Sequence, residues 1–499
     1  MDSNLFALIE SRCRPGASFL ETPAGARWTY GDLLSVTGRF ANALRTAGVR
    51  PGDRVAAQVE KSPEAYCLYL AVLRVGAIYV PLNTAYTPAE LEYFLGDAQP
   101  AALVCDPADA ARRFALAEAA GVRARFTLDA AGGGTLPSIA AHEPAAFETV
   151  ERAPEDVAAI LYTSGTTGRA KGAMLTHGNL ASNGAALAKA WGFGPDDVLL
   201  HALPIFHAHG LFIAAHCALL SGASMLFASR FVAEEVVELL PRATVMMGVP
   251  TFYTRLLESP RLDRDLCRGV RLFVSGSAPL LPDTAAAFTA RTRHEILERY
   301  GMTEAIVIAS NPLRGERRPG SVGLPVEGVE LRVADADDVP LPRGAVGGVQ
   351  IRGTGVMKGY WRQPERTAQE FTRDGWFRTA DLGVLAPDGY LSLVGRAKDL
   401  VISGGYNVYP KEVELAIDAL PGVAESAVFG LPHDDFGEAV TAAVVRSDPA
   451  VDDAAILAAL RERLAAYKLP KRVHFVDALP RNAMGKVLKT ALRERFTGR

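Results

Sequence analysis

The stretch Ala158-Ala159-Ile160-Leu161-Tyr162, followed by Thr163-Ser164-Gly165-Thr166-Thr167-Gly168-Arg169-Ala170-Lys171-Gly172, decides the fold. An apolar run of strand type leads into four hydroxyl side chains, three glycines and one lysine within ten residues. Glycine lets backbone N–H groups approach an anion, hydroxyls donate further hydrogen bonds and lysine adds positive charge. This composition predicts a loop that binds phosphate.

The loop differs from the Walker motif, which requires G-x4-G-K-[ST]. Gly165 and Gly168 are only three residues apart, and Gly172 follows Lys171 where the motif has Ser or Thr. The next residues, 173–175, predict a second strand, and Thr176 is a typical N-cap for a helix after it. We therefore expect the loop to join two strands, so it does not begin a helix.

On both sides of this loop, short apolar runs alternate with helical patterns from Asp53 to about Ala278. Such alternation indicates an α/β fold with parallel, doubly wound sheets whose ligands bind at the carboxyl ends of the strands. The runs that predict strands are 54–59, 77–80, 101–105, 198–202, 223–227, 244–249 and 271–275. The segments that predict helices are 63–75, 88–95, 232–240 and 251–257.

The pattern changes after about residue 311. Residues 311–395 are rich in Gly and Pro with short β-type runs, which favours a small barrel or a distorted sheet. Helical and strand patterns then resume, so we expect a large domain over 1–395 and a small α+β domain over 396–499. This division agrees with a chain of 499 residues, long enough for about three folding units.

Charge excludes a general binder of nucleic acid or anionic membranes, because 53 Lys+Arg and 56 Asp+Glu give a net charge of −3. Residues 461–499 differ from the rest, with 11 basic and 3 acidic side chains, a net +8. Such a segment is either a solvated basic face or a site for a polyphosphate ligand.

The compartment follows from the cysteines and from the N-terminus. Five scattered cysteines without a C-x-x-C pair indicate free thiols in a reducing environment. No signal-peptide pattern is visible, and the most apolar stretch, 66–82, is broken by Arg74, Gly76 and Pro81. We expect a cytoplasmic protein without a membrane span.

Six ordered blocks closely resemble the signatures of the acyl-adenylate-forming superfamily, which includes acyl-CoA synthetases, peptide-synthetase adenylation domains and beetle luciferases. The resemblance covers essentially the whole chain. The blocks are Tyr162–Gly172, Ser275–Leu280, Glu298–Glu304, Gly375–Asp381, Gly395–Asp399 and Pro480–Lys486.

The resemblance implies an enzyme that works in two half-reactions. A carboxylate attacks the α-phosphate of ATP to give acyl-AMP and pyrophosphate, and the thiol of coenzyme A then displaces AMP. ATP, Mg²⁺ and coenzyme A are the implied cofactors, since the developing and departing phosphates need charge stabilisation.

The resemblance also assigns residues to the nucleotide. The β- and γ-phosphates would be bound by Thr163, Ser164, Gly165, Thr166, Thr167, Gly168 and Lys171. The adenine side would be formed by Gly276, Ser277, Ala278, Tyr300, Gly301 and Met302, with Tyr300 stacked on the base. Thr303 would reach the α-phosphate, and the Glu304 carboxylate would hold Mg²⁺, which prefers oxygen ligands.

Further roles fall in the last quarter of the chain. Asp381 would accept hydrogen bonds from the ribose hydroxyls, and Arg396 would contact ribose or phosphate. Lys486 would bridge the substrate carboxylate and the α-phosphate during adenylation. The small domain would pivot at Lys398 and bring a loop with Gly404 and Gly405 to the pantetheine arm, where glycine permits close backbone approach.

Other segments resemble one subfamily, the malonyl-CoA synthetases. These segments are Cys105–Pro107, His201–Leu211, Gly248–Arg255 and Ser403–Glu412. A dicarboxylate needs a partner for its second carboxylate, because an unpaired buried charge is very costly. The candidates are Arg255, His207 and His209, of which His207 is also a candidate catalytic residue; a surface arginine and structural histidines are the alternatives.

Two positions depart from that subfamily. Ala208 stands between the two histidines where Thr is frequent, and Val307 stands where Met is frequent. Smaller side chains at both positions predict a pocket that also accepts methylmalonate or a larger 2-substituted malonate.

Three alternatives remain open from the sequence. The enzyme could activate another short- or medium-chain acid, it could load a carrier-protein thiol, or the chain could be a non-catalytic nucleotide-binding module. Lys486 and Glu304 argue against the last alternative, because merely holding a nucleotide requires neither. Monomer and homodimer are equally compatible with the sequence.

Overall fold

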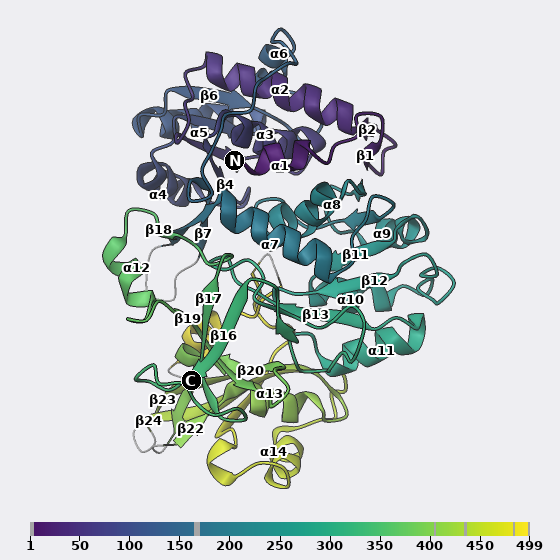
Figure 1. Cartoon of the computed structure of the whole chain (residues 1–499). Helices are drawn as coiled ribbons and strands as arrows, with labels where there is room; N and C mark the ends of the chain where they lie inside the picture. The colour runs from purple at the N-terminus through teal and green to yellow at the C-terminus, as the bar shows by residue number, and fades with distance from the viewer. Residues whose placement is uncertain (1–3, 164–169, 404–405, 434–436, 483–484, 498–499) are drawn as a thin grey trace. The chain divides into compact units, whose positions relative to one another are not determined.

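The computed structural model describes residues 4–163, 170–403, 406–433, 437–482 and 485–497, which divide into two compact units (Figure 1). Unit 1 comprises residues 1–319, 323–330 and 352–371, and unit 2 comprises residues 320–322, 331–351 and 372–499. Most of the β-rich segment thus groups with the C-terminal residues, whereas the sequence assigns it to the large domain. The domain boundary predicted between residues 395 and 396 concerns which residues move together, and it stays a prediction.

Unit 1 contains a mixed sheet that, within the described residues, has seven strands in the order β18-β8-β7-β4-β3-β5-β6. The pairs β7–β4–β3–β5–β6 are parallel, and β8 and β18 add antiparallel strands at one edge. Their bounds are β3 Arg54–Gln58, β4 Ile78–Pro81, β5 Ala102–Cys105, β6 Ala124–Thr127, β7 Val157–Thr163, β8 Lys171–Thr176 and β18 Gly359–Tyr360.

A second sheet of unit 1 has nine strands in the part of the chain that is described, in the order β15-β14-β13-β12-β11-β9-β10-β1-β2. Its central strands are parallel, so the predicted α/β class is confirmed. The bounds are β1 Ser18–Glu21, β2 Arg27–Thr29, β9 Val198–His201, β10 Ser224–Phe227, β11 Val245–Gly248, β12 Leu272–Ser275, β13 Ile296–Tyr300, β14 Ala309–Ser310 and β15 Leu324–Pro325.

Helices connect and cover these strands (Figure 1). The helices of unit 1 are α1 Leu5–Glu10, α2 Tyr30–Thr46, α3 Pro63–Val75, α4 Pro88–Ala98, α5 Ala110–Ala119, α6 Thr135–Ala140, α7 His177–Ala190, α8 Ala215–Ser221, α9 Ala233–Leu239, α10 Pro250–Glu258, α11 Pro282–Thr292 and α12 Pro364–Glu370. In the described residues, no helix is both long and apolar enough to cross a membrane.

Local sequence signals explain where the helices begin and end. The Ser62 side chain accepts a hydrogen bond from the Ala65 N–H, Pro63 opens α3, and Gly76 closes it in the left-handed region at φ 75°. Thr176 caps α7 with a reciprocal bond to Asn179, as the sequence predicts. These caps fix where the chain turns back toward each sheet.

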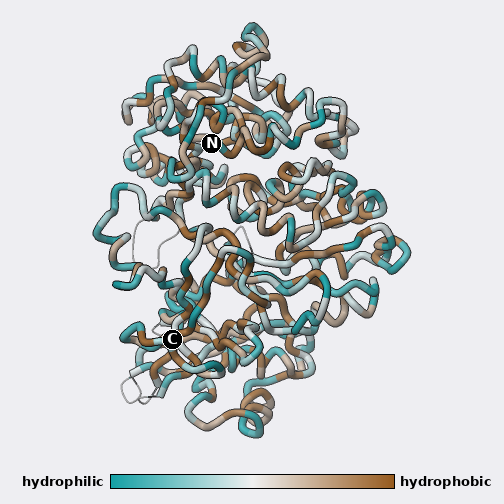
Figure 2. Tube along the Cα trace, in the orientation of Figure 1, coloured by the Kyte–Doolittle hydropathy of each residue, from teal (hydrophilic) through white to brown (hydrophobic). Residues whose placement is uncertain are grey.

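Apolar side chains fill the space between strands and helices. One cluster packs β9, β11 and β12 against α9, α10 and α11, and a second packs β3, β4 and β7 against α4. Figure 2 shows these hydrophobic segments alternating along the chain with hydrophilic loops. Burial of this apolar surface is the main favourable contribution to folding.

Among the described residues, unit 2 holds most of two further sheets. The first has the order β16-β17-β19-β20 and lies in the segment for which the sequence predicts a small barrel or a distorted sheet. Its strand pairing shifts register at Gly348 and at Leu382. The second has the order β22-β21-β24-β23, with β25 beside β24. The bounds are β16 Val329–Ala334, β17 Val346–Gly353, β19 Phe377–Leu385, β20 Leu391–Arg396, β21 Val401–Ser403, β22 Tyr406–Val408, β23 Val423–His433, β24 Gly437–Arg446, β25 Arg472–Phe475, α13 Pro410–Asp418, α14 Asp453–Arg461 and α15 Lys489–Phe496.

Helix α4 holds both strands that flank the predicted phosphate loop. The Tyr162 hydroxyl, near the end of β7, donates to the Asp97 carboxylate at 2.6 Å. The Tyr93 hydroxyl donates at 2.7 Å to the backbone oxygen of Ala170, just before β8. Because both partners lie on one helix, the two ends of the loop keep a fixed separation.

Replacing Tyr93 by Phe should weaken nucleotide binding at the loop, since it removes the bond that fixes the Ala170 end. A neutral hydrogen bond contributes about 1 kcal/mol, which corresponds to a rise of about fivefold in KM for ATP. Steady-state kinetics with varied ATP measure this change.

Tyr86→Phe is the matched control for that substitution. The Tyr86 ring also packs beside Phe94, and among the described residues its hydroxyl forms no hydrogen bond. An equal rise in KM for both variants would show that the Tyr93 bond to Ala170 plays no special part.

Candidate active site

The two strands that flank the phosphate loop pair so that Thr163 lies opposite Lys171. The predicted loop therefore leaves and re-enters the sheet at neighbouring positions, and it joins two antiparallel strands as the sequence indicates. The predicted phosphate ligands Ser164, Gly165, Thr166, Thr167 and Gly168 lie outside the described residues.

Lys171 and Glu304 lie on either side of one tyrosine. The Lys171 ammonium lies 4.1 Å from the centre of the Tyr360 ring and 3.3 Å from the Glu370 carboxylate. The Tyr360 hydroxyl donates to the Glu304 carboxylate at 3.1 Å. Glu304 is only 7% exposed, and its proximity together with burial raises the pKa of Tyr360. The lysine predicted to bind phosphate and the glutamate predicted to hold a metal thus belong to one cluster in unit 1.

The residues predicted to contact adenine and the α-phosphate follow two neighbouring parallel strands. Gly276, Ser277 and Ala278 follow β12, and Gly301, Met302 and Thr303 follow β13, which pairs with β12. The carboxyl ends of these strands lie together at one edge of the sheet, where open α/β sheets bind ligands. Tyr300, the predicted stacking residue, is the last residue of β13 and is buried.

Gly301 is required by the turn that follows it. A Cβ atom at this position would lie 1.9 Å from the backbone oxygen of Ile306. Ile306 adopts φ 60°, a left-handed conformation that is strained for a β-branched residue. Together the two residues fold the chain sharply back and bury Val307.

The histidines predicted for the acid lie at a π-helical turn, His209–Ala214. Such turns occur frequently at functional sites. His209 is fully buried, and its Nδ1 lies 3.2 Å from the Ser277 hydroxyl. Burial, with repulsion from Arg299 next, lowers the pKa of His207 to about 4 and the pKa of His209 well below its usual range. Both histidines are therefore neutral at physiological pH.

The cation that lowers the pKa values of both histidines, after burial, is Arg299. It is 4% exposed on β13, and burial lowers the pKa of its guanidinium to about 10. Its Nε and Nη2 atoms have no hydrogen-bond partner among the described residues, and the same holds for Nε2 of His209. A Cβ atom at Gly276 would lie 2.3 Å from the Arg299 Nε, so the guanidinium passes directly beside that glycine.

The two arginines of this region differ in burial. Arg255, the candidate from the sequence, lies in the last turn of α10 and is exposed, so its contact with a carboxylate stays a prediction. Arg299 belongs to the quoted block Glu298–Glu304, but nothing in the strand pattern shows that its side chain is buried. Ala208 and Val307, predicted to enlarge the pocket, are both buried.

Unit 2 holds the remaining predicted residues. Asp381 on β19 pairs in register with Arg396 on β20, and their carboxylate and guanidinium lie 3.1 Å apart. Asp381 is buried, whereas Arg396 is partly exposed. Lys398 lies in a short helical turn directly after β20, and Gly404 and Gly405 lie outside the described residues.

Two hydrogen bonds join Lys486 to Asn482. The Lys486 N–H donates to the Asn482 side chain, and the Asn482 N–H donates to the Lys486 oxygen, each at 2.9 Å. Burial, followed by repulsion from Arg396, lowers the pKa of Lys486 to about 8, although Asp381 opposes the shift. Lys486, Asp381 and Arg396 therefore interact electrostatically within unit 2.

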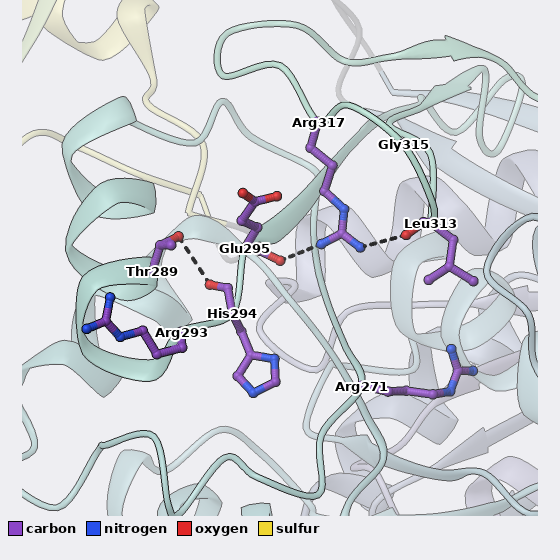
Figure 3. Close-up of a pocket in the computed structure, with 8 residues that line it drawn as sticks. All are labelled: Arg271, Thr289, Arg293, His294, Glu295, Leu313, Gly315 and Arg317. Atoms are coloured by element: carbon purple, nitrogen blue, oxygen red, sulfur yellow. Dashed lines mark hydrogen bonds between the residues drawn. The ribbon is translucent and has the colours of Figure 1, made fainter.

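A separate pocket of about 390 Å³ opens on unit 1 and contains none of the predicted site residues (Figure 3). Two of its three arginines are already held by protein groups. Arg317 donates to the backbone oxygens of Glu295 and Leu313, and Arg271 pairs with Asp197 at 2.7 Å. We assign no function to this pocket.

Comparison with known proteins identifies the family. Residues 10–361 match the AMP-binding enzyme family model, and residues 412–486 match the AMP-binding enzyme C-terminal domain. The solved structure of ATP-bound MatB from Rhodopseudomonas palustris superimposes with a TM-score of 0.98 at 52% identity, covering 100% of this chain and 99% of that one.

Two curated relatives carry the names of different acids. A feruloyl-CoA synthase from Amycolatopsis sp is 38% identical over 95% of this chain and 94% of its own length. A malonate–CoA ligase from Arabidopsis thaliana is 33% identical over 94% of this chain and 85% of its own length. The chain therefore belongs to the AMP-binding enzyme family and is an AMP-forming acid–CoA ligase.

Proposed function

We propose that this enzyme joins malonate, or a 2-substituted malonate such as methylmalonate, to coenzyme A. In the first half-reaction a carboxylate oxygen bonds to the α-phosphorus of ATP and pyrophosphate leaves. In the second, the sulfur of coenzyme A bonds to the acyl carbon and AMP leaves. The products are malonyl-CoA, AMP and pyrophosphate.

Buried Arg299 is the observation that carries this proposal. A guanidinium removed from water is costly unless an anion or several hydrogen-bond acceptors compensate. Within the described part of the chain, Nε and Nη2 have neither. The free carboxylate of a malonate would supply two acceptor oxygens to this planar donor, an arrangement that guanidinium groups favour.

The neighbouring histidines support a dicarboxylate. His207 and His209 are neutral because burial and Arg299 lower their pKa values, so they can offer N–H donors without adding further charge. His209 Nε2 has no partner in the described structure. We propose that His207 and His209 orient the acid while Arg299 balances its second charge.

The small residues near this cluster would set which malonates fit. Ala208 and Val307 are buried, and each replaces a larger side chain frequent in malonyl-CoA synthetases. Removing atoms from a packed pocket leaves space that a 2-methyl group could fill. We therefore include methylmalonate among the proposed substrates.

For the nucleotide, we propose that Lys171 binds the terminal phosphates and Thr303 the α-phosphate, with Gly276–Ala278 and Tyr300–Met302 around adenine. The cluster fits Mg²⁺, because the Glu304 carboxylate is a buried oxygen ligand. In the described residues no group of three acidic, His or Cys side chains could hold a metal alone, so Glu304 would share the ion with phosphate oxygens. Bound Mg²⁺ would neutralise charge on the departing pyrophosphate.

In unit 2, we propose that Asp381 and Arg396 bind the ribose and that Lys486 supplies the adenylation cation. Lys398 is the proposed hinge, and Gly404 and Gly405 the proposed pantetheine contacts. Loading of a carrier-protein thiol and activation of a monocarboxylic acid are the competing functions; the name of the feruloyl-CoA synthase relative supports the second. Location in the cytoplasm also remains a prediction.

An acid panel tests the proposal directly. With free coenzyme A and no carrier protein, we expect AMP release to be fastest with malonate or methylmalonate, ahead of acetate, butyrate, benzoate and ferulate. Arg299→Gln should raise KM for malonate by at least about 150-fold, because breaking a buried charge pair costs about 3–5 kcal/mol and 3 kcal/mol corresponds to about 150-fold.

Arg255→Gln is the matched control, since it removes the exposed arginine of the same unit and should leave malonate kinetics unchanged. Faster turnover of any monocarboxylate by the wild type would refute the malonate assignment. Malonate turnover that requires a carrier protein would favour the carrier-loading alternative.

Lys486→Ala should block acyl-AMP formation and spare thioester formation from preformed malonyl-AMP, because only adenylation needs the bridging cation. Malonate-dependent exchange of pyrophosphate into ATP measures the first half-reaction, and malonyl-CoA formed from synthetic malonyl-AMP measures the second. Equal losses in both would contradict the assigned role.

The pH profile gives a second test of Lys486. Since the pKa of Lys486 is lowered to about 8, the cationic form is lost as pH rises through that value. We expect kcat/KM for adenylation to fall above about pH 8, approaching tenfold per pH unit, as for one essential protonated group. Lys486→Arg should abolish this decline in whatever activity it retains, and a decline unchanged in that variant would assign it to another group.

A further inference from the structure

Lys61 is a buried cation that none of the proposed roles uses. It lies between β3 and α3 and is only 5% exposed. In the described structure it forms no ion pair, and Glu235 is the acidic group whose field reaches it. Burial without a paired carboxylate lowers the pKa of this lysine well below its usual range.

The Lys61 ammonium is held by a histidine from the other sheet of unit 1. Its nitrogen lies 2.8 Å from Nδ1 of His201 and donates to the His201 backbone oxygen, also at 2.8 Å. It also lies 4.2 Å from the centre of the Phe227 ring, on the strand beside β9. The contact therefore joins the segment after β3 to the end of β9.

His201 continues this chain of bonds to the turn that carries the acid-site histidines. Its Nε2 lies 2.9 Å from the backbone oxygen of Gly210. A carbonyl only accepts hydrogen bonds, so Nε2 carries the proton and Nδ1 is the acceptor for Lys61. Lys61 thus selects the tautomer of His201 that can donate to Gly210.

Gly210 lies in the π-helical turn directly after His209. A Cβ atom at Gly210 would lie 2.2 Å from the Pro204 oxygen, so this turn packs closely on the preceding segment. The next N–H, of Leu211, donates to the His207 oxygen at 2.9 Å. A shift of the Gly210 carbonyl would therefore move the backbone that places His207 and His209.

We propose that Lys61 is a positioning residue for the acid site, acting through His201 and Gly210 to fix the turn that presents His207 and His209. This inference rests on the proposed function, in which those histidines contact the acid. Lys61 itself touches neither the acid nor ATP in this proposal.

A buried cation without a counter-ion contributes little to the stability of the fold. We therefore expect Lys61 to have a positioning role. Replacing a buried ion pair by apolar side chains of similar volume is frequently neutral or stabilising. For Lys61, relief of an uncompensated buried charge offsets the loss of its two hydrogen bonds to His201. Lys61→Met should therefore fold as well as the wild type, and its loss should appear in the acid site.

The test is the kinetics of Lys61→Met with the acid that the wild type uses best. Without its partner, His201 can adopt the other tautomer and release Gly210. We expect KM for the acid to rise about tenfold. An effect of this size is typical when a group that orients a ligand-binding histidine is removed. We expect KM for ATP to rise less than KM for the acid, because among the described residues proposed for ATP only Ser277 is hydrogen-bonded to this turn, through His209. The melting temperature should be unchanged or higher.

A double-mutant cycle with His201→Phe tests the route through His201. If Lys61 acts through that ring, Lys61→Met should add no further increase in acid KM to the His201→Phe variant. Arg74→Met is the matched control: Arg74 is another buried cation of unit 1, bonded to Thr37 and to the Leu34 and Phe147 oxygens. It should leave acid KM unchanged.

The outcomes separate this inference from the proposed function. If the wild type releases AMP with no acid, or prefers a monocarboxylate, the proposed function is wrong. Three results would contradict the positioning role in a wild type that is active with the acid. Lys61→Met could have a normal KM for the acid, or it could raise KM for ATP as much as KM for the acid. It could also raise KM for the acid further when combined with His201→Phe.

Discussion

The candidate acid site depends on one constraint, a guanidinium buried where solvent cannot compensate its charge. Arg299 lies beside Gly276, and a side chain at Gly276 would occupy the space that the guanidinium needs. Its field and the surrounding burial keep His207 and His209 neutral. The glycine, the arginine and the two histidines come from three separate parts of the chain, and each is constrained by the others.

Buried and partly buried cations recur in this protein, and their partners differ. Lys171 lies between a carboxylate and the face of Tyr360, which places it near Glu304 without a direct ion pair to it. Lys61 has an imidazole and a carbonyl as partners. Arg299 has the fewest hydrogen-bond partners within the described residues, which is why we connect it with the substrate.

The elements that the sequence predicted well are those whose signals are local. The helix over Pro63–Val75 agrees at both ends, because Ser62, Pro63 and Gly76 act within one turn of it. The antiparallel pair around the phosphate loop also agrees, since Thr176 and the short apolar runs mark its limits. Parallel strands followed from their alternation with helices.

The predictions that failed or stayed open depend on contacts between distant residues. Arg255 and Arg299 each lie within a segment that resembles the family. Only packing shows that the first is exposed and the second is buried. The π-helical turn at His209 has no pattern distinct from an ordinary helix. The grouping of residues 331–351 with the C-terminal part likewise depends on pairing between strands far apart in the chain.

The sequence alone determined the family and the class of reaction, because these depend on short, ordered motifs, and the same motifs predict the nucleotide-binding blocks. It also determined that the acid would need a cationic partner if it carried two charges. Only the tertiary structure decided which cation is removed from water, since burial is a property of packing between strands and helices. The same packing brought Lys61 to His201, a contact across 140 residues that no local pattern encodes.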